Sequence, residues 1–219
     1  MFKLLCPIPR TVYVAVSGGV DSMAALNFLA RSHDVSAVFF DHGDSHALGT
    51  LDFIQQYCRK INVKVLDGAL MRSKSNDESL EEYWRSERYR FFDHVVEQEQ
   101  RPIVTAHHLD DAVETWVWSS LNGQPTLPHV MRGQLLRPFL ATPKRELIDW
   151  AVRHSVPWME DPTNNDMRRT RNIIRNEGMD FIHKVNPGIE TMIRKKLLEN
   201  VKKASESVDS NPSDVTLVT

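Results

Sequence analysis

A glycine-containing segment near the start of the chain has the composition of a phosphate-binding loop. It follows the β-branched run Thr11 to Val16 and consists of Ser17, Gly18, Gly19, Val20, Asp21 and Ser22. Ser22 then caps an apolar-periodic stretch through Leu29, which gives the order strand, turn, helix. A glycine pair alone would indicate no more than a turn. At a strand-to-helix switch, however, backbone N–H groups and the helix dipole attract anions, and the Ser17 and Ser22 hydroxyls can donate to them, so we expect a nucleotide site.

This loop differs from the loop of kinases and related phosphoryl-transfer enzymes. It lacks the Gly-Lys-Ser/Thr ending of a Walker A motif, so no lysine is positioned to assist γ-phosphoryl transfer. Asp21 instead puts a carboxylate beside the phosphates, which is repulsive unless Mg²⁺ lies between them. We therefore expect Mg²⁺ as a cofactor, with Asp21 as a metal ligand and a catalytic residue.

A second group of reactive side chains lies at 107–115, after a later predicted strand. On a helix, Asp110 and Glu114 share a face at i, i+4, and Asp111 and Glu114 share one at i, i+3. Such a cluster needs a cation, and Asp111 is our second candidate Mg²⁺ ligand. The alternative is helix capping by Asp110 with solvated acids. Adjacent histidines point apart and make poor metal pairs, so we expect His107 and His108 to be nucleotide-pocket or capping residues.

A third feature is a basic run from Met167 to Arg175 that contains no acid. Its four arginines are candidates for contacts with RNA phosphates, because guanidinium pairs bidentately with phosphate; they are Arg168, Arg169, Arg171 and Arg175. Some of them could instead tie down the acidic loop at 160–166, and the sequence leaves both interpretations open. The net charge of −2 adds no general argument for nucleic-acid binding.

The elements that must position these residues alternate along the chain. The apolar patterns predict strands at 11–16, 35–40, 63–66 and 102–106, and helices after Ser22 and at 51–61, 79–99 and 109–121. This alternation predicts an α/β fold with a parallel sheet and helices on both faces. Residues 1–130 would form the nucleotide-binding domain. Residues 131–204 would form a small, mostly helical C-terminal region, with helices from Thr142 and at 190–203, and residues 205–219 a disordered tail.

Composition sets the broad class of protein. With 219 residues, of which 41% are hydrophobic, the chain can bury an ordinary core. No apolar run approaches the roughly 18 residues of a membrane span, and the first ten residues show no signal-peptide pattern, so we expect a cytoplasmic protein without membrane contact. Cys6 and Cys58 lack any paired spacing for zinc, an iron–sulfur cluster or a disulfide.

The loop at 17–22 resembles the PP-loop signature of the ATP pyrophosphatase superfamily, and three further segments are similar to the tRNA(Ile)-lysidine synthetase family. Phe40-Asp41-His42-Gly43 resembles the family's His-Gly turn at the ATP site. The motif at 107–115 resembles its catalytic-cleft segment. The most discriminating match is Glu160-Asp161-Pro162-Thr163-Asn164 followed by Arg171-Asn172-Ile173-Ile174-Arg175. The family usually has Leu-Arg where Asp44 and Ser45 stand, so a phosphate contact from that arginine is lost here or supplied elsewhere; the glutamine usual at Ala112 is also missing.

The resemblance implies an adenine nucleotide α-hydrolase-like fold and a two-step reaction. ATP would adenylate the wobble cytidine of a tRNA(Ile) with a CAU anticodon, and free L-lysine would displace AMP to form lysidine. It implies that ATP is the co-substrate and that His42 and His107 line the nucleotide pocket. It also implies that Asp110, Asp111 and Glu114 bind a metal ion or the lysine ammonium group, and that one of these acids is the base. Arg88, on a helix with Arg85 and Tyr89 that is similar to one of the family, is the candidate for the lysine carboxylate or the activated intermediate.

The chain is shorter than family members with additional C-terminal tRNA-binding domains, so we expect a minimal form, with a homodimer as a possible assembly. Two alternatives remain. A tRNA thiolase would use the same activation but commonly needs paired or catalytic cysteines, which this chain does not supply. A non-catalytic nucleotide- or RNA-binding relative would keep the scaffold without turnover, against which Asp21 and the acidic helix argue.

Overall fold

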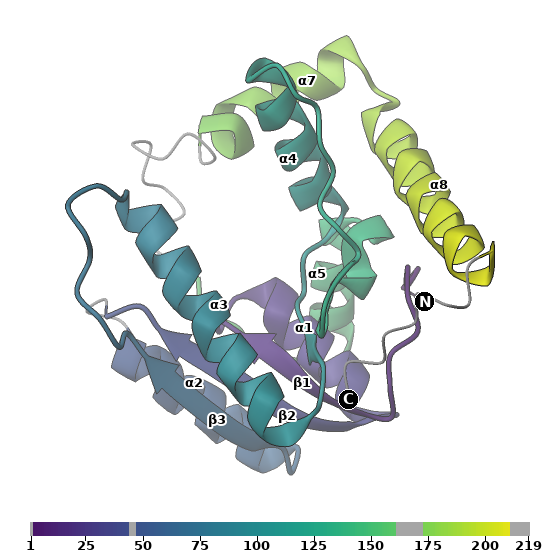
Figure 1. Cartoon of the computed structure of the whole chain (residues 1–219). Helices are drawn as coiled ribbons and strands as arrows, with labels where there is room; N and C mark the ends of the chain where they lie inside the picture. Colours follow the sequence, from purple (N-terminus) through teal and green to yellow (C-terminus); the bar gives the residue numbers. More distant parts are fainter. Residues whose placement is uncertain (1, 44–46, 161–172, 211–219) are drawn as a thin grey trace.

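The computed structural model describes residues 2–43, 47–160 and 173–210, and within these ranges the strands form one six-stranded sheet (Figure 1). The order across the sheet is β3-β2-β1-β4-β6-β5. All neighbouring strands are parallel except β5 and β6, which pair antiparallel. The strands are β1 (Thr11–Val16), β2 (Asp34–Asp41), β3 (Lys64–Ala69), β4 (Ile103–Val104), β5 (Met131–Arg132) and β6 (Leu135–Leu136).

Helices connect and cover these strands. In the first part of the chain they are α1 (Val20–Ala30), α2 (Ala47–Lys60), α3 (Leu80–Glu99) and α4 (Leu109–Leu121). The second part contains the 3-10 turn η1 (Pro138–Ala141), α5 (Lys144–Arg153), the π-helical turn η3 (Ile174–Gly178), α7 (Met179–Val185) and α8 (Ile189–Ser210). No helix of the described residues is long and apolar enough to cross a membrane.

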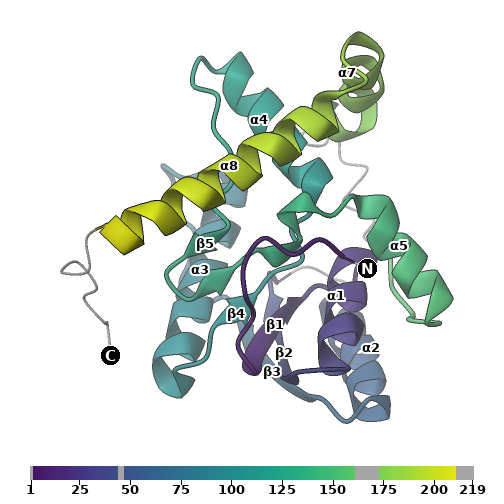
Figure 2. The same cartoon turned by 90° about the vertical axis from the view of Figure 1, so that its right-hand side faces the viewer.

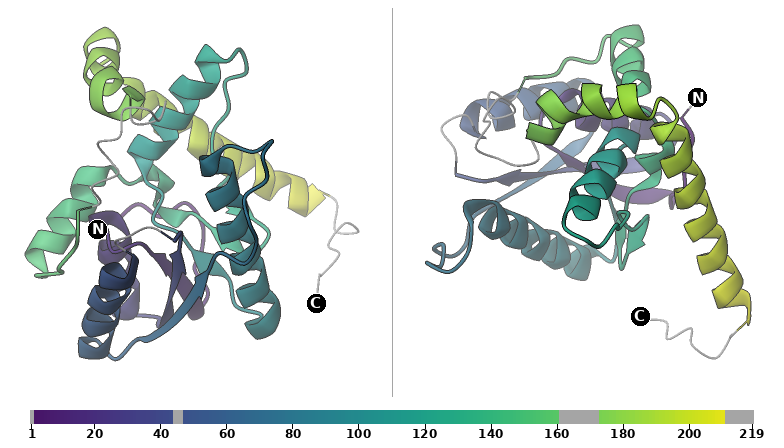
Figure 3. Two further views of the ribbon diagram at one scale, coloured as in Figure 1. Left: turned by 90° about the vertical axis from the view of Figure 1, so that its left-hand side faces the viewer. Right: turned by 90° about the horizontal axis from the view of Figure 1, so that it is seen from above.

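The two faces of the sheet are set by the alternation of side chains along β1. Val12, Val14 and Val16 point into one hydrophobic core, which also holds apolar side chains of α1, α2 and α5. Tyr13 points to the opposite face, into a smaller core with Phe92 and Val95 of α3. Figure 3 shows α3 on one side of the sheet and α1 and α2 on the other. The predicted parallel sheet with helices on both faces is therefore confirmed.

A separate hydrophobic core holds the C-terminal helices against α4. It contains Leu109 and Val113 of α4 and Ile189, Ile193 and Leu197 of α8, all buried. The spacing of the α8 residues is one helical face. Figure 2 shows α8 as a long helix crossing α4. α4 therefore joins the sheet to the mostly helical C-terminal region that the sequence predicted.

The structure adds two features that the hydrophobic pattern did not indicate. Met131–Arg132, for which the pattern predicts no strand, pairs with Leu135–Leu136 in a short antiparallel hairpin at the edge of the sheet. Two-residue strands are too short to produce a recognisable alternation. In addition, α8 continues to Ser210, beyond the predicted end at residue 203 and into the segment expected to be disordered; residues 211–219 lie outside the described part.

Candidate active site

The order of the strands in the sheet by itself indicates where a ligand site should lie. β2 and β3 lie on one side of β1, while β4 and β6 lie on the other. The connections therefore leave β1 and β4 in opposite directions, and ligands of open α/β sheets bind outside the carboxyl ends of strands at such a switch point. The loop at 17–22 follows β1, and His107 and His108 follow β4. The two motifs that the sequence singled out thus flank the same position.

The phosphate loop is shaped by its own side chains. Ser17 N donates to Ser22 Oγ at 3.1 Å, and the Ser22 hydroxyl donates to the Gly19 carbonyl at 3.0 Å. Ser22 therefore lies inside the first turn of α1 and closes the loop, while the N-cap position is Gly19, without a side-chain cap. The N–H groups of this first turn, at residues 20–22, have no carbonyl partner within the helix, so they remain available for an anion.

Gly18 is required by both its backbone angle and its surroundings. Its φ is +82°, a conformation that L side chains rarely adopt, and an added Cβ would lie 2.9 Å from the Thr50 side chain. Its carbonyl accepts a hydrogen bond from Met159 N at 2.9 Å. The segment that precedes the Glu160-Asp161-Pro162 motif is therefore hydrogen-bonded to the phosphate loop.

His108 links the phosphate loop to α4. Its Nε2 lies 3.4 Å from Asp21 Oδ2 and 3.5 Å from Asp111 Oδ2, and its backbone N donates to Asp111 Oδ2 at 3.0 Å. Burial alone lowers the pKa of His108, but Asp111, Asp21 and Asp110 outweigh it and raise the pKa to about 9. A charged His108 therefore neutralises carboxylates from two segments.

Arg175 closes the other side of this cluster. Its Nε donates to Glu114 Oε1 at 2.7 Å, and its Nη2 donates to Glu114 Oε2 at 3.0 Å and to Asp111 Oδ1 at 3.2 Å. The sequence left open whether Arg175 contacts RNA or braces the acidic loop at 160–166. Among the described residues, its guanidinium contacts the acids of α4, while residues 161–166 of the acidic loop lie outside them. Arg168, Arg169 and Arg171 lie outside the described residues.

Lys144 is a site residue that the sequence did not indicate. Its Nζ lies 3.7 Å from Asp21 Oδ2, and its backbone N, at the start of α5, donates to Asp110 Oδ1 at 2.9 Å. Asp110 therefore caps the beginning of α5 rather than α4. The predicted helix start at Thr142-Pro143 put Lys144 in a first turn, but nothing in its spacing connected it with Asp21, which lies on another helix.

Of the two predicted Mg²⁺ ligands, Asp21 has an oxygen available for the ion, whereas Asp111 does not. Asp21 Oδ1 is buried and has no hydrogen-bond partner among them, so this oxygen is available to a cation. Both oxygens of Asp111 are engaged, Oδ1 by Arg175 and Oδ2 by His108. The described part of the chain has no cluster of three or more metal-binding side chains. The free oxygen of Asp21 suits Mg²⁺, which binds through one or two carboxylates together with substrate phosphates.

The remaining candidates surround this centre. His107 Nδ1 lies 2.8 Å from Thr105 Oγ1, and burial lowers the pKa of His107 to about 4, helped by the charges of Arg137 and Arg88. A neutral His107 suits a nucleotide pocket. His42 follows β2 at the same edge of the sheet, where its ring packs against Phe40 and Trp84. Arg88, half-buried on α3, lies close enough for its charge to act on His107.

A loop of this shape at the switch point of a mostly parallel sheet defines a PP-loop nucleotide-binding protein. The sequence matches the family described as the PP-loop domain over residues 5–181, and the chain belongs to this family. Within it, the chain is similar to tRNA(Ile)-lysidine synthases. It is 34% identical to that of Lactiplantibacillus plantarum, over 84% of this chain and 44% of the relative. It is 31% identical to that of Thermosipho africanus, over 87% of this chain and 48% of the relative.

The chain spans less than half the length of these curated relatives. Among solved structures, the U34-tRNA thiolase NcsA from Methanococcus maripaludis has a similar fold, with a TM-score of 0.72 and 14% sequence identity. That alignment covers 90% of this chain and 74% of the thiolase. At this level of identity the likeness concerns the fold alone.

Proposed function

We propose that the chain carries out the lysidine reaction: adenylation of the wobble cytidine of a tRNA(Ile) with a CAU anticodon, then attack by free L-lysine with release of AMP. The observation that carries this proposal is the continuous charged path from Asp21 through His108 and Asp111 to Arg175 and Glu114. It joins a predicted phosphate-binding loop to a pair of acids on α4, of which Glu114 is buried. Activation and amine attack can then occur within one site. All three substrates are cytoplasmic, and so, we propose, is the protein.

In the first step the chain holds the ATP phosphates and orients the cytosine oxygen toward the α-phosphorus. The first-turn N–H groups at residues 20–22 and Lys144 bind phosphate oxygens, and Asp21 would hold Mg²⁺, which supplies charge neutralisation at the leaving pyrophosphate. Neutral His107 lines the nucleotide pocket. Positioning and electrostatics account for most of the rate enhancement in such a transfer.

In the second step the acids of α4 receive the lysine amine. Asp110 is committed to the start of α5, and the charges of His108 and Arg175 hold the pKa of Asp111 low although burial opposes them. Glu114 is therefore our choice of base, although Arg175 contacts both of its oxygens. Burial raises the pKa of Glu114 although Arg175 opposes this, and a raised pKa favours accepting a proton from an ammonium group. Arg175 orients that carboxylate, and Arg88 remains the candidate for the lysine carboxylate.

A tRNA thiolase is the second candidate, because a thiolase shares the fold. The cysteines do not favour it. Cys58 is fully buried in the main core, and burial raises its pKa to about 11, while burial also raises the pKa of Cys6. A nucleophilic or metal-binding cysteine needs a lowered pKa. Neither thiol therefore has the environment that sulfur transfer requires.

The test is incubation with ATP, labelled lysine and an unmodified tRNA transcript with a CAU anticodon, followed by nucleoside analysis. We expect labelled lysidine together with AMP and pyrophosphate, because the loop lacks a lysine of the Walker type. ADP and orthophosphate as primary products would refute the PP-loop chemistry. Pyrophosphate release without incorporated lysine would retain the adenylation and reject the lysine step.

A further inference from the structure

Three arginines from distant parts of the sequence converge on one tyrosine outside the charged path of the active site. The guanidinium carbons of Arg85 and Arg132 lie 5.0 and 5.3 Å from the centre of the Tyr89 ring, and Arg137 Nη2 donates to the Tyr89 hydroxyl at 2.9 Å. Arg85 and Tyr89 are on α3, while Arg132 and Arg137 belong to the β5–β6 hairpin and its end. We call these four residues the Tyr89 cluster.

The positive charge of this cluster is not neutralised within the described residues. None of Arg85, Arg132 and Arg137 has a carboxylate within 4.0 Å in that part of the chain, although other surface arginines such as Arg72 and Arg90 do. Arg137 is only 5% exposed and uses its guanidinium on the His129 carbonyl and the Tyr89 hydroxyl. A buried, uncompensated guanidinium creates a positive potential, which favours an external anion.

The positive potential of the cluster affects the pKa of Tyr89. Burial raises the pKa of its phenol, but the charges of Arg137, Arg85 and Arg88 together lower that pKa below its ordinary value. Arg137 and Arg88 also act on His107 in the candidate active site. Tyr89 and His107 therefore lie within range of the same two charges.

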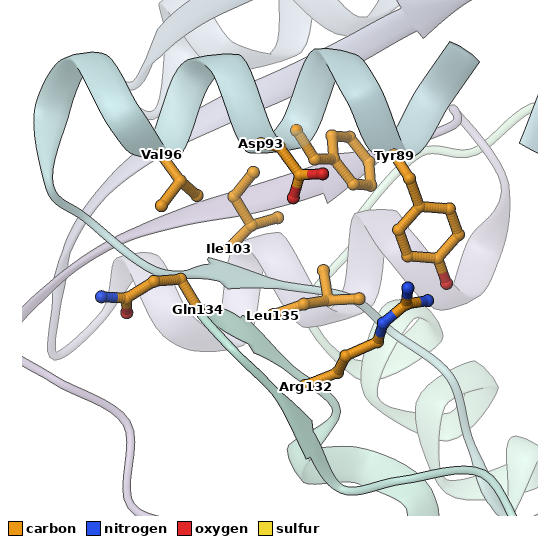
Figure 4. A pocket seen from close by; sticks show the side chains of 8 residues that line it. Tyr89, Asp93, Val96, Ile103, Arg132, Gln134 and Leu135 are labelled. Carbon is orange, nitrogen blue, oxygen red and sulfur yellow. The ribbon is translucent and has the colours of Figure 1, made fainter. Parts of the chain in front are cut away.

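A small cavity adjoins the cluster. It has a volume of about 60 Å³ and is lined by Tyr89 and other α3 side chains on one side and by Arg132, Gln134 and Leu135 on the other (Figure 4). Asp93 is the acid of this lining, and it forms no ion pair with a described arginine. Arg85 and Arg132 are exposed beside the cavity. The cavity is too small for a nucleotide.

We propose that the Tyr89 cluster is an RNA-binding surface, on which Arg85 and Arg132 contact backbone phosphates of the tRNA whose wobble base enters the active site. Guanidinium groups next to an aromatic ring suit a single-stranded loop, since they can pair with phosphate while the exposed planes stack on unpaired bases. An acidic protein would match the charge but would not need proximity to the nucleotide pocket. The proposal rests on the proposed function for its RNA, and it deepens that function by supplying a contact surface outside the run at 167–175.

The experiment measures binding of an unmodified tRNA transcript with a CAU anticodon at several salt concentrations. The variants are Arg132→Gln and Arg85→Gln, and neither residue belongs to the active site. Each substitution should weaken binding about two- to fivefold at low salt, as expected for an exposed ion pair. Each should also lower the slope of log affinity against log salt by about one unit. Pyrophosphate release from ATP at saturating tRNA should stay unchanged.

Arg101→Gln is the matched control, because Arg101 also lies over a tyrosine ring, that of Tyr13 at 6.0 Å, but pairs with Glu99. It removes the same charge without touching the cluster. Unchanged affinity and salt slope in folded Arg132→Gln and Arg85→Gln, or values equal to those of Arg101→Gln, would overturn the proposal. So would a wild-type protein that does not bind the transcript. A lowered slope in a protein that makes no lysidine would keep the RNA surface and reject only the proposed reaction.

Discussion

The phosphate loop takes its binding groups from six consecutive residues, whereas the charged cluster beside it combines side chains from four separate segments. In the loop, Ser17, Gly19 and Ser22 hydrogen-bond one another. In the cluster, Asp21 pairs with His108 and with Lys144, while Glu114 pairs with Arg175, which lies 61 positions away in the sequence. Local backbone geometry builds the first region, and tertiary packing builds the second.

This difference determines which substitutions should disrupt each region. A loop held by its own hydrogen bonds should be damaged only by changes within it or against it. A cluster of alternating charges depends on every member, because removing one cation leaves a carboxylate partly buried without its partner. Asp21 belongs to both regions, so the comparison predicts that its loss is the most damaging.

Asp21→Ala should have the largest effect. It removes a buried oxygen that is available to Mg²⁺ and the partner of both His108 and Lys144, so pyrophosphate release should fall at least about 10²- to 10³-fold. Circular dichroism should show an intact fold. Asp52→Ala, an exposed acid on α2, is the control. Activity of Asp21→Ala equal to that of this control would remove Asp21 from the catalytic residues.

Glu114→Gln should have the second largest effect, and it should impair the lysine step more than the adenylation step. The amide keeps the size of the side chain and an acceptor for Arg175, but it cannot take a proton from lysine. We expect kcat/KM for lysine to fall about 10²-fold, with pyrophosphate release changed by less than about tenfold. Glu97→Gln, an exposed acid on α3, is the control. An unchanged dependence on lysine would exclude Glu114 as the base.

Arg175→Ala tests whether the charged cluster depends on long-range packing. It leaves Glu114 and Asp111 without their shared cation, and because the arginine side chain is 35% exposed we expect a loss of about 1–3 kcal/mol in unfolding free energy. The melting temperature should fall, while ATP binding and the salt slope of tRNA binding should stay unchanged.

Arg175→Lys keeps the charge but not the bidentate geometry, so it should recover part of the lost stability. The opposite pattern for Arg175→Ala, a lowered salt slope with an unchanged melting temperature, would return Arg175 to the RNA-binding arginines. It would also refute the role that the geometry supports.

Gly18→Ala should have the smallest effect and should stay confined to the loop. A left-handed conformation costs an L-residue about 1–2 kcal/mol, and the new Cβ would also press on Thr50, so ATP binding should weaken. Gly123→Ala is a matched control, since φ there is +83° with nothing within 4 Å of an added Cβ. Equal loss of stability in both variants with unchanged ATP affinity would contradict the loop's role.

The sequence by itself determined most elements of the first part of the chain and predicted the phosphate loop, because both depend on local rules. Its patterns predicted β1 at 11–16 and α4 at 109–121 with their observed ends, and α3 to within one residue. Glycine, hydroxyl and acid types in one short segment were enough to predict the nucleotide site. The sequence also placed Asp111 and Glu114 on one face of one helix, where the structure shows them sharing Arg175.

Only the tertiary structure decided which charges meet. No sequence spacing links Lys144 with Asp21, Arg175 with Glu114, or Arg132 with Tyr89, because each pair joins elements that follow different strands. Nor did the pattern reveal the β5–β6 hairpin that carries Arg132. Electrostatic partners are set by distance in space, and the order of strands in the sheet, which brings the ends of β1 and β4 side by side, fixes those distances.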